Sequence, residues 1–316
     1  MFDTLLRIRL FVAVYEERSF TSAALRENAT QSGVTQHIQK LEEHLGVMLF
    51  VRRSGIVQPT PAADRYYESC IEMLRAHAQT RMSVRPFTEG LGGEVLVGLT
   101  PTLTRAALAP TLSRFVAEHP NVVVRVTDAY SDVVVSKVRS GELDFAVVPG
   151  AQAEVGLRSE LFARTPEFLV CSAHAGHELV HGQSVRLAQL GPIKLVLPSQ
   201  AQSRRATLDA YLAAVGAAVE RKLELDTSLG ALDFVARSDW MSIHPAIMML
   251  RDMDRNDFIV NPLADPPLTL DLFRIERASE PLSPAARAFL GALEQQTSAM
   301  VVEANALVEA AKAQAR

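Results

Sequence analysis

The first sixty residues show apolar side chains at helical spacing, interrupted by short polar segments. This pattern predicts three helices, over residues 3–17, over residues 22–27, and from Thr30 to Gly46. Thr21 is the expected N-cap of the second helix and Thr30 of the third, because a threonine oxygen accepts a hydrogen bond from a free backbone N–H. The third helix has one apolar stripe, made of Val34, Ile38, Leu41 and Leu45.

The opposite face of the third helix carries Gln31, Ser32, Thr35, Gln36 and Gln39. Such side chains can match the donors and acceptors that DNA presents in its major groove. Arg52 and Arg53 then precede a Ser-Gly turn, which predicts a small hairpin whose arginines suit phosphate or a narrow minor groove. The sequence therefore predicts a winged helix-turn-helix, with a solvated face on a helical bundle as the alternative. The candidate DNA contacts are Thr21, Ser22, Thr30, Gln31, Ser32, Thr35, Gln36, Gln39, Arg52 and Arg53.

A long helix is predicted to follow, from Pro61 to about Arg85, where Pro86 ends it. Its apolar residues have the spacing of a coiled-coil seam, and they are Tyr67, Ile71, Leu74 and Ala78. This stripe is expected to join two chains, and the alternative is an intramolecular helix that packs on the sensor. A glycine-rich segment over residues 89–93 is the expected hinge.

After the hinge, runs of strand length alternate with helical patterns as far as Pro245. This alternation predicts parallel sheets covered by helices. A long excursion divides the region into two subdomains, one of residues 89–167 and 263–300 and the other of residues 168–262. A ligand cleft is expected between them.

Polar side chains gather where the predicted strands of this region end, and ligands of open α/β sheets bind at those ends. Helix N-termini there favour an anion, and Arg204 or Arg205 could clamp a carboxylate, since no acidic residue interrupts either hydroxyl-rich cluster in the sequence. Simple helix capping is the alternative for each residue. The candidate ligand contacts are Thr100, Thr102, Thr104, Ser199, Gln200, Gln202, Ser203, Arg204, Thr227 and His244, with Phe145, Phe168 and Phe273 as a candidate apolar wall.

Composition narrows the class of protein. The chain has 316 residues, which implies two or three domains, and its net charge of −4 requires any DNA-binding surface to be local. Two distant cysteines, Cys70 and Cys171, fit a reducing cytosol, and no signal peptide or membrane span is visible. The spacing of His174, His177 and His181 matches no metal motif, so neither a metal nor another cofactor is expected.

The N-terminal motifs resemble those of the LysR-type transcriptional regulators. They are SFTSAA (19–24), TQSGVT (30–35), Ile38, Leu41-Glu42, Leu45-Gly46, Leu49-Phe50, Arg52 and Thr60. The resemblance implies double-stranded promoter DNA as partner, RNA polymerase as a candidate further partner, a dimer through the linker helix, and a homotetramer through paired sensor domains. It also implies an effector domain built like a periplasmic binding protein. The family usually has leucine where Glu27 stands, and Leu25 is expected to supply the missing apolar contact.

The sequence therefore predicts a cytoplasmic, non-enzymatic DNA-binding regulator controlled by a small organic carboxylate, with an aromatic acid as the narrower hypothesis. The predicted parts are residues 1–60 (DNA binding), 61–88 (linker), 89–300 (effector) and 301–316 (tail). The tail is expected to form a helix that packs on a neighbouring subunit, or else to fray. The alternative to a regulator is a solute-binding protein or enzyme with an accessory helical module, which promoter binding with steep salt dependence would exclude.

Overall fold

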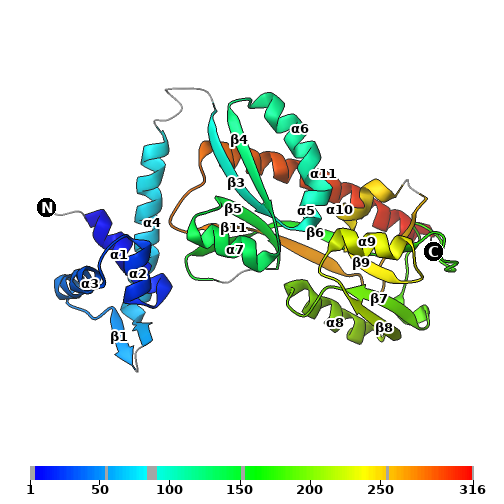
Figure 1. The fold of residues 1–316 in the computed structure, drawn as a ribbon, viewed down its shortest axis with the longest axis horizontal. Helices are drawn as coiled ribbons and strands as arrows, with labels where there is room; N and C mark the ends of the chain where they lie inside the picture. Colours follow the sequence, from blue (N-terminus) through cyan, green and yellow to red (C-terminus); the bar gives the residue numbers. More distant parts are fainter. Residues whose placement is uncertain (1–3, 54–55, 84–90, 151–153, 254–255, 315–316) are drawn as a thin grey trace. The chain divides into compact units, whose positions relative to one another are not determined.

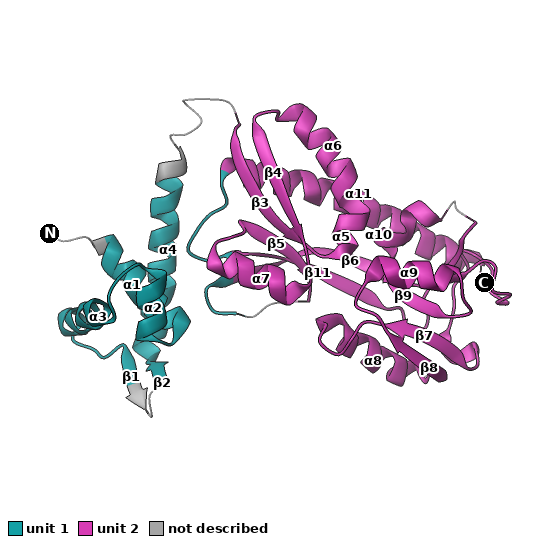
Figure 2. Ribbon diagram, viewed as in Figure 1, with its two compact units in different colours: residues 1–90, 154–157, 277–283 teal, residues 91–153, 158–276, 284–316 magenta. Residues whose placement is uncertain are grey.

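The computed structural model describes residues 4–53, 56–83, 91–150, 154–253 and 256–314, and for residues 52, 53, 56 and 81–83 it describes the backbone only. The chain forms two compact units (Figures 1 and 2). Unit 1 contains residues 1–90, 154–157 and 277–283, and unit 2 contains the rest.

Unit 1 is built on three helices and a hairpin. Its elements are α1 (Thr4–Glu17), α2 (Phe20–Arg26), α3 (Gln31–Leu45), β1 (Phe50–Arg53), β2 (Ile56–Pro59) and α4 (Pro61–Ser83). The two strands pair antiparallel, with Arg53 opposite Ile56, so the predicted wing is confirmed in its backbone. Phe11, Val34 and Ile38 are buried in one core, which holds α3 against α1.

The caps of these helices follow the sequence at α3 and differ at α2. The Gly33 N–H donates to the Thr30 hydroxyl at 3.1 Å, and Gly46 ends α3 in the left-handed conformation, both as predicted. At α2 the prediction was wrong, because Ser19 and not Thr21 is the cap. Capping at Ser19 places Phe20 in the first helical turn, where its ring is buried against the core.

The expectation for Leu25 was also wrong. Its side chain is 76% exposed, so it makes no compensating contact with the core. Instead the Glu27 carboxylate forms an ion pair with Arg9 at 2.7 Å. An acidic residue is therefore accommodated at this position by a charged partner on α1.

The apolar stripe of α4 packs inside unit 1 over most of its length. The ring of Tyr67 stacks on Tyr15 with 4.1 Å between centroids, and its hydroxyl donates to Glu16 at 2.7 Å. Ile71 and Leu74 lie partly buried against the same core. The stripe therefore contributes to the helical core of unit 1 and stays partly exposed, so its role as a seam between two chains remains a prediction.

Unit 2 contains a nine-stranded mixed sheet in the order β4-β3-β5-β11-β6-β9-β7-β8, with β10 paired to β6. Its strands are β3 (Gly93–Leu99), β4 (Val122–Asp128), β5 (Phe145–Pro149), β6 (Leu157–Ser172), β7 (Ile193–Leu197), β8 (Val219–Glu224), β9 (Met241–Pro245), β10 (Phe258–Pro262) and β11 (Thr269–Arg277). The strands of each half, β3 to β5 and β7 to β9, are parallel as predicted. The long strands β6 and β11 pair antiparallel with them, because the chain crosses between the halves within the sheet.

Helices cover the sheet in both halves (Figure 1). They are α5 (Pro101–Leu103) continuing through the π-helical turn η2 (Thr104–Leu108) into α6 (Ala109–Glu118), α7 (Ser131–Ser140), α8 (Ser203–Val215), α9 (Ser228–Ala236), α10 (Ala246–Met249) and α11 (Pro284–Gln314), with short 3₁₀ turns η3 (Leu187–Gln189) and η4 (Leu250–Asp252). The predicted tail helix is the end of α11, and its stripe of Met300, Ala304 and Ala311 is buried. These buried side chains show that the tail helix packs on its own chain, and a contact with a neighbouring subunit remains a prediction. No helix in the described ranges is long and apolar enough to cross a membrane.

Candidate DNA-reading and effector sites

The polar face of α3 is open to solvent. Gln31, Ser32, Gln36 and Gln39 are exposed, and Thr35 is half-buried. The Thr35 hydroxyl donates to the Gln31 carbonyl at 2.9 Å, which ties it to its own helix. The exposed amides of Gln36 and Gln39 make no hydrogen bond to the described part of the chain, so both remain available to a partner.

The other candidate DNA contacts lie at the start of α2 and in the hairpin. Thr21 is exposed in the first turn of α2, where the Ser22 N–H donates to the capping Ser19 hydroxyl at 3.2 Å. Arg52 and Arg53 end β1, and their side chains lie outside the described part of the structure. The backbone therefore places both arginines beside the hairpin turn, as a wing requires.

In unit 2, Thr100 stands where β3 ends and α5 begins, and Thr104 follows one helical turn later. The Thr100 side chain is only 4% exposed, and its hydroxyl has no hydrogen-bond partner among the described residues. The Thr104 hydroxyl donates to the Thr100 carbonyl at 3.2 Å, and Thr102 is half-buried. A buried hydroxyl without a partner carries a free-energy cost, which a bound ligand would relieve.

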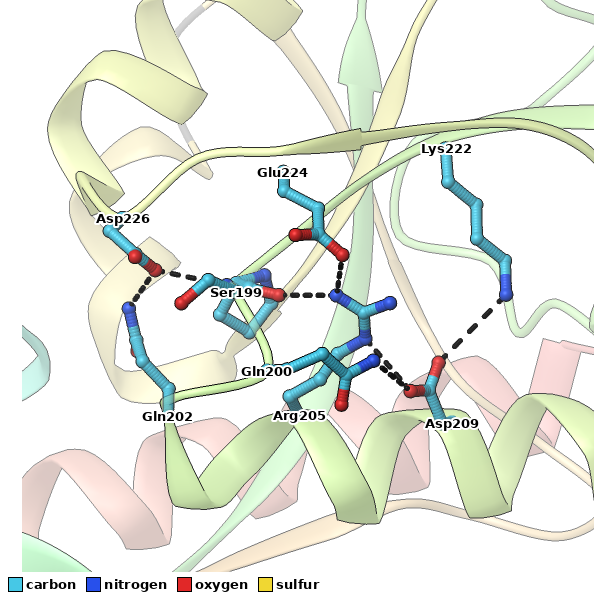
Figure 3. A network of polar contacts seen from close by, with 9 residues as sticks. Ser199, Gln200, Gln202, Arg205, Asp209, Lys222, Glu224 and Asp226 are labelled. Carbon is cyan, nitrogen blue, oxygen red and sulfur yellow. Dashed lines mark hydrogen bonds and ion pairs between the residues drawn. The ribbon is translucent and has the colours of Figure 1, made fainter.

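The cluster that precedes α8 is already satisfied by acidic side chains (Figure 3). The Asp226 carboxylate accepts from the Ser199 N–H at 2.9 Å and from the Gln202 amide at 2.5 Å, and the hydrogen bonds to Ser199 lower the pKa of Asp226. The Gln200 amide donates to Asp209 at 3.3 Å, and Ser203 is exposed. No acidic residue interrupts this cluster in the sequence, but the fold brings carboxylates to it from other segments of the chain.

Both arginines of α8 are engaged within unit 2, so neither is the free carboxylate clamp that the sequence suggested. Arg204 forms a two-pronged bond to Glu167, with its Nε 3.0 Å and its Nη2 2.6 Å from the two carboxylate oxygens, and also donates to the Ile243 carbonyl. The buried Arg205 donates to Asp209 at 2.8 Å, Glu224 at 2.6 Å and the Pro198 carbonyl. Thr227 is a cap, since its hydroxyl accepts from the Gly230 N–H at 3.2 Å.

His244 is buried on β9 with an unpartnered ring nitrogen. Its side chain is 5% exposed, and its Nε2 has no hydrogen-bond partner in the described ranges. Burial, reinforced by the nearby Arg204 and Arg105, lowers the pKa of His244 to about 3, so the imidazole is neutral near pH 7. Arg105 is itself paired with Asp252 at 2.7 Å. Arg105, five residues beyond Thr100, also donates to the carbonyl of Met248 in α10, so the start of α5 lies near the helix that follows β9.

Two residues of this region were missed by the sequence reasoning. They are Asp128 and Tyr130. Burial raises the pKa of Asp128, and a hydrogen bond with the Thr104 hydroxyl partly offsets this rise. Burial and, to a lesser extent, the negative charge of Asp226 raise the pKa of Tyr130, whereas a hydrogen bond with Gln202 lowers it. Tyr130, two residues after β4, therefore lies near Gln202 and its partner Asp226. The position of Asp128 at the carboxyl end of a predicted strand was the signal that could have found it.

The other side chains considered as functional candidates are three phenylalanines, two cysteines and the possible metal ligands. Phe145 and Phe168 are completely buried in the core, whereas Phe273 is partly exposed. Burial raises the pKa of both Cys70 and Cys171 to about 11, which makes neither thiol a ready nucleophile. No metal-binding group of histidine, cysteine or acidic side chains occurs among the described residues.

A winged helix-turn-helix joined to a two-part α/β domain defines a DNA-binding transcriptional regulator with a sensor. Residues 5–64 match the family described as bacterial regulatory helix-turn-helix protein, lysR family, and residues 88–298 match the LysR substrate binding domain. Because these matches cover most of the chain, it belongs to the LysR family of transcriptional regulators, and it is not an enzyme.

Relatives and solved structures agree with this assignment. The chain is 26% identical over 303 residues to the HTH-type transcriptional regulator YfeR of Shigella flexneri, covering 94% of this chain and 96% of that protein. It is 27% identical over 295 residues to the HTH-type transcriptional regulator GalR of Pseudomonas putida, and the alignment covers 92% of this chain and 73% of that protein. Its fold is similar to that of a full-length OxyR variant from Pseudomonas aeruginosa, with 20% sequence identity and a TM-score of 0.56 over 92% of this chain and 100% of that one. It is also similar to the fold of CbnR complexed with its target DNA, with 19% identity and a TM-score of 0.53 over 93% of this chain and 99% of that one.

Proposed function

We propose that this regulator reads operator DNA with the exposed face of α3 and changes its DNA binding when a small organic acid binds in unit 2. The exposed, unengaged amides of Gln36 and Gln39 support the reading of bases. The start of α2 and the arginines of the hairpin would contact the flanking backbone. A dimer reading two half-sites, further paired into a tetramer, and contact with RNA polymerase complete the proposal.

The effector site is proposed at the carboxyl ends of β3 and β9. The observation that carries it is the pair of buried, unpartnered polar atoms, the Thr100 hydroxyl and the His244 Nε2. A carboxylate there would accept hydrogen bonds from the hydroxyl and from the ring N–H of one tautomer, beside the two cations Arg105 and Arg204. Each of these cations is paired with an acidic group, so the effector carboxylate would be held by hydrogen bonds and not by a dedicated arginine.

The opposite end of the site suits a hydrogen-bond donor. Asp128, Tyr130 and Asp226 offer oxygen atoms there, and the Asp226 carboxylate already occupies the position that an anion would take before α8. An acid that also bears a hydroxyl or amino group would match both ends. An aromatic acid remains the narrower hypothesis, with the partly exposed Phe273 as the candidate apolar contact.

Thr100→Val tests the effector site. The change removes a hydroxyl that has no partner and keeps the side chain's shape, so the melting temperature without ligand should be unchanged or slightly higher. Small aliphatic and aromatic carboxylates that raise the melting temperature of the wild type should lose this effect in Thr100→Val and in His244→Leu. There are two controls. The primary amides of the same acids, which carry no negative charge, should not raise the melting temperature of the wild type, and the variant Thr207→Val, at an exposed position, should keep the wild-type response to the acids. An undiminished shift in both site variants would contradict this placement of the ligand.

A further inference from the structure

A hollow of about 390 Å³ lies in unit 1 between α3, the start of α2 and the strand β1. Its floor is made of the buried rings of Phe20 and Phe50 together with Ile38. Its rim includes Met48, which is 60% exposed, and Val51, which is 40% exposed. The hollow is thus an apolar depression with large apolar side chains left open to solvent at its edge, an arrangement typical of an interaction site.

The hollow offers little to a charged or strongly polar partner. Its one ionisable lining residue is Glu42, whose carboxylate accepts from the backbone N–H groups of Leu49 at 2.7 Å and Phe50 at 3.0 Å. That carboxylate holds the segment that enters β1. It would also repel a phosphate, so the hollow does not suit the charged part of a DNA backbone.

Two residues join this hollow to the face of α3 proposed to read DNA. Thr35 and Gln39 line the hollow and also belong to that face. A base edge presented to Gln39 therefore lies beside an apolar depression. In the major groove of DNA the apolar feature of a base pair is the C5-methyl group of thymine.

We propose that this hollow receives the 5-methyl group of an operator thymine, which Met48 and Val51 contact from the rim. These two side chains would then determine sequence preference at a position that the polar residues of α3 do not specify. The inference rests on the proposed role of α3 in reading DNA. Met48 and Val51 lie outside α3, so this apolar contact is additional to those of the polar face that the sequence pattern predicted.

The test uses the full chain and the duplex that it selects from a random library. Each thymine of that duplex is replaced in turn by deoxyuridine, which lacks only the methyl group. For the wild type we expect one position in each half-site to weaken binding about fourfold, because burying a methyl group contributes a factor of this size. In Met48→Ala and in Val51→Ala the same replacement should weaken binding by less than about twofold.

Val47→Ala is the matched control, because Val47 is 43% exposed beside Met48 and does not line the hollow, so this variant should keep the wild-type response to deoxyuridine. The proposal is overturned if no thymine is sensitive in the wild type, or if the sensitivity is the same in the rim variants as in the wild type. Failure of the underlying DNA-reading proposal would look different, since then a Gln36→Ala variant would bind the selected duplex as well as the wild type does.

Discussion

Glu167→Ala is expected to lower the free energy of unfolding of unit 2 by about 3–5 kcal/mol, because removing one partner of a buried ion pair leaves the other charge uncompensated. Glu167 is 2% exposed at its side chain and Arg204 is 15% exposed, and two hydrogen bonds join them. The pair ties α8 to β6, the strand through which the chain crosses between the two halves of the sheet.

Urea denaturation followed by tryptophan fluorescence measures this effect. The chain has a single tryptophan, Trp240, which lies in unit 2 immediately before β9, so the signal reports that unit. Glu178→Ala removes an exposed carboxylate from the same unit and should change the free energy of unfolding by no more than about 0.5 kcal/mol. A loss of less than about 1 kcal/mol in Glu167→Ala would mean that Arg204 does not depend on this partner, and its role as a ligand clamp would have to be reconsidered.

Gln36→Ala should weaken binding to the selected duplex by about 1–3 kcal/mol, because a glutamine amide that bonds to a base edge contributes about this much discrimination. Gln36 is exposed, so the thermal stability of the variant should equal that of the wild type. Fluorescence anisotropy with a labelled duplex gives the affinity, and Gln189→Ala, which changes an exposed glutamine of unit 2, is the control.

Arg53→Ala separates base reading from backbone contact. Loss of a phosphate contact should weaken binding to all duplexes alike and reduce the slope of affinity against salt concentration by about one. If Gln36→Ala behaved in this same uniform way, its side chain would be a backbone contact and not a reader of bases.

Local signals in the sequence predicted local structure well. The cap at Thr30 and the glycine at position 46 act within one helical turn of the chain, so the residues that decide the outcome are neighbours in sequence. The cap of α2 was harder, since Ser19 and Thr21 both have suitable hydroxyls. The burial of Phe20 among residues distant in sequence favours Ser19, and no local pattern contains that information.

Long-range partners explain why the effector site was only partly predicted. Arg204 and the residues before α8 looked free because their carboxylates, Glu167 and Asp226, lie 37 and 27 positions away from Arg204 and Ser199. Helical periodicity likewise identified the stripes of α4 and α11 without showing what covers them. The Thr100 hydroxyl and the His244 Nε2 could be recognised as buried atoms without a hydrogen-bond partner only from the three-dimensional structure, because their neighbours come from distant parts of the sequence.

The most direct test of the account is the sequence preference of the protein, measured by selecting duplexes from one random library with the wild type and with Gln36→Ala. We predict that the wild type enriches a sequence with two related half-sites, and that the variant relaxes the preference at one position in each half-site while the rest is retained. Identical preferences for the two proteins, or no enriched sequence for the wild type, would contradict the claim that α3 reads the operator.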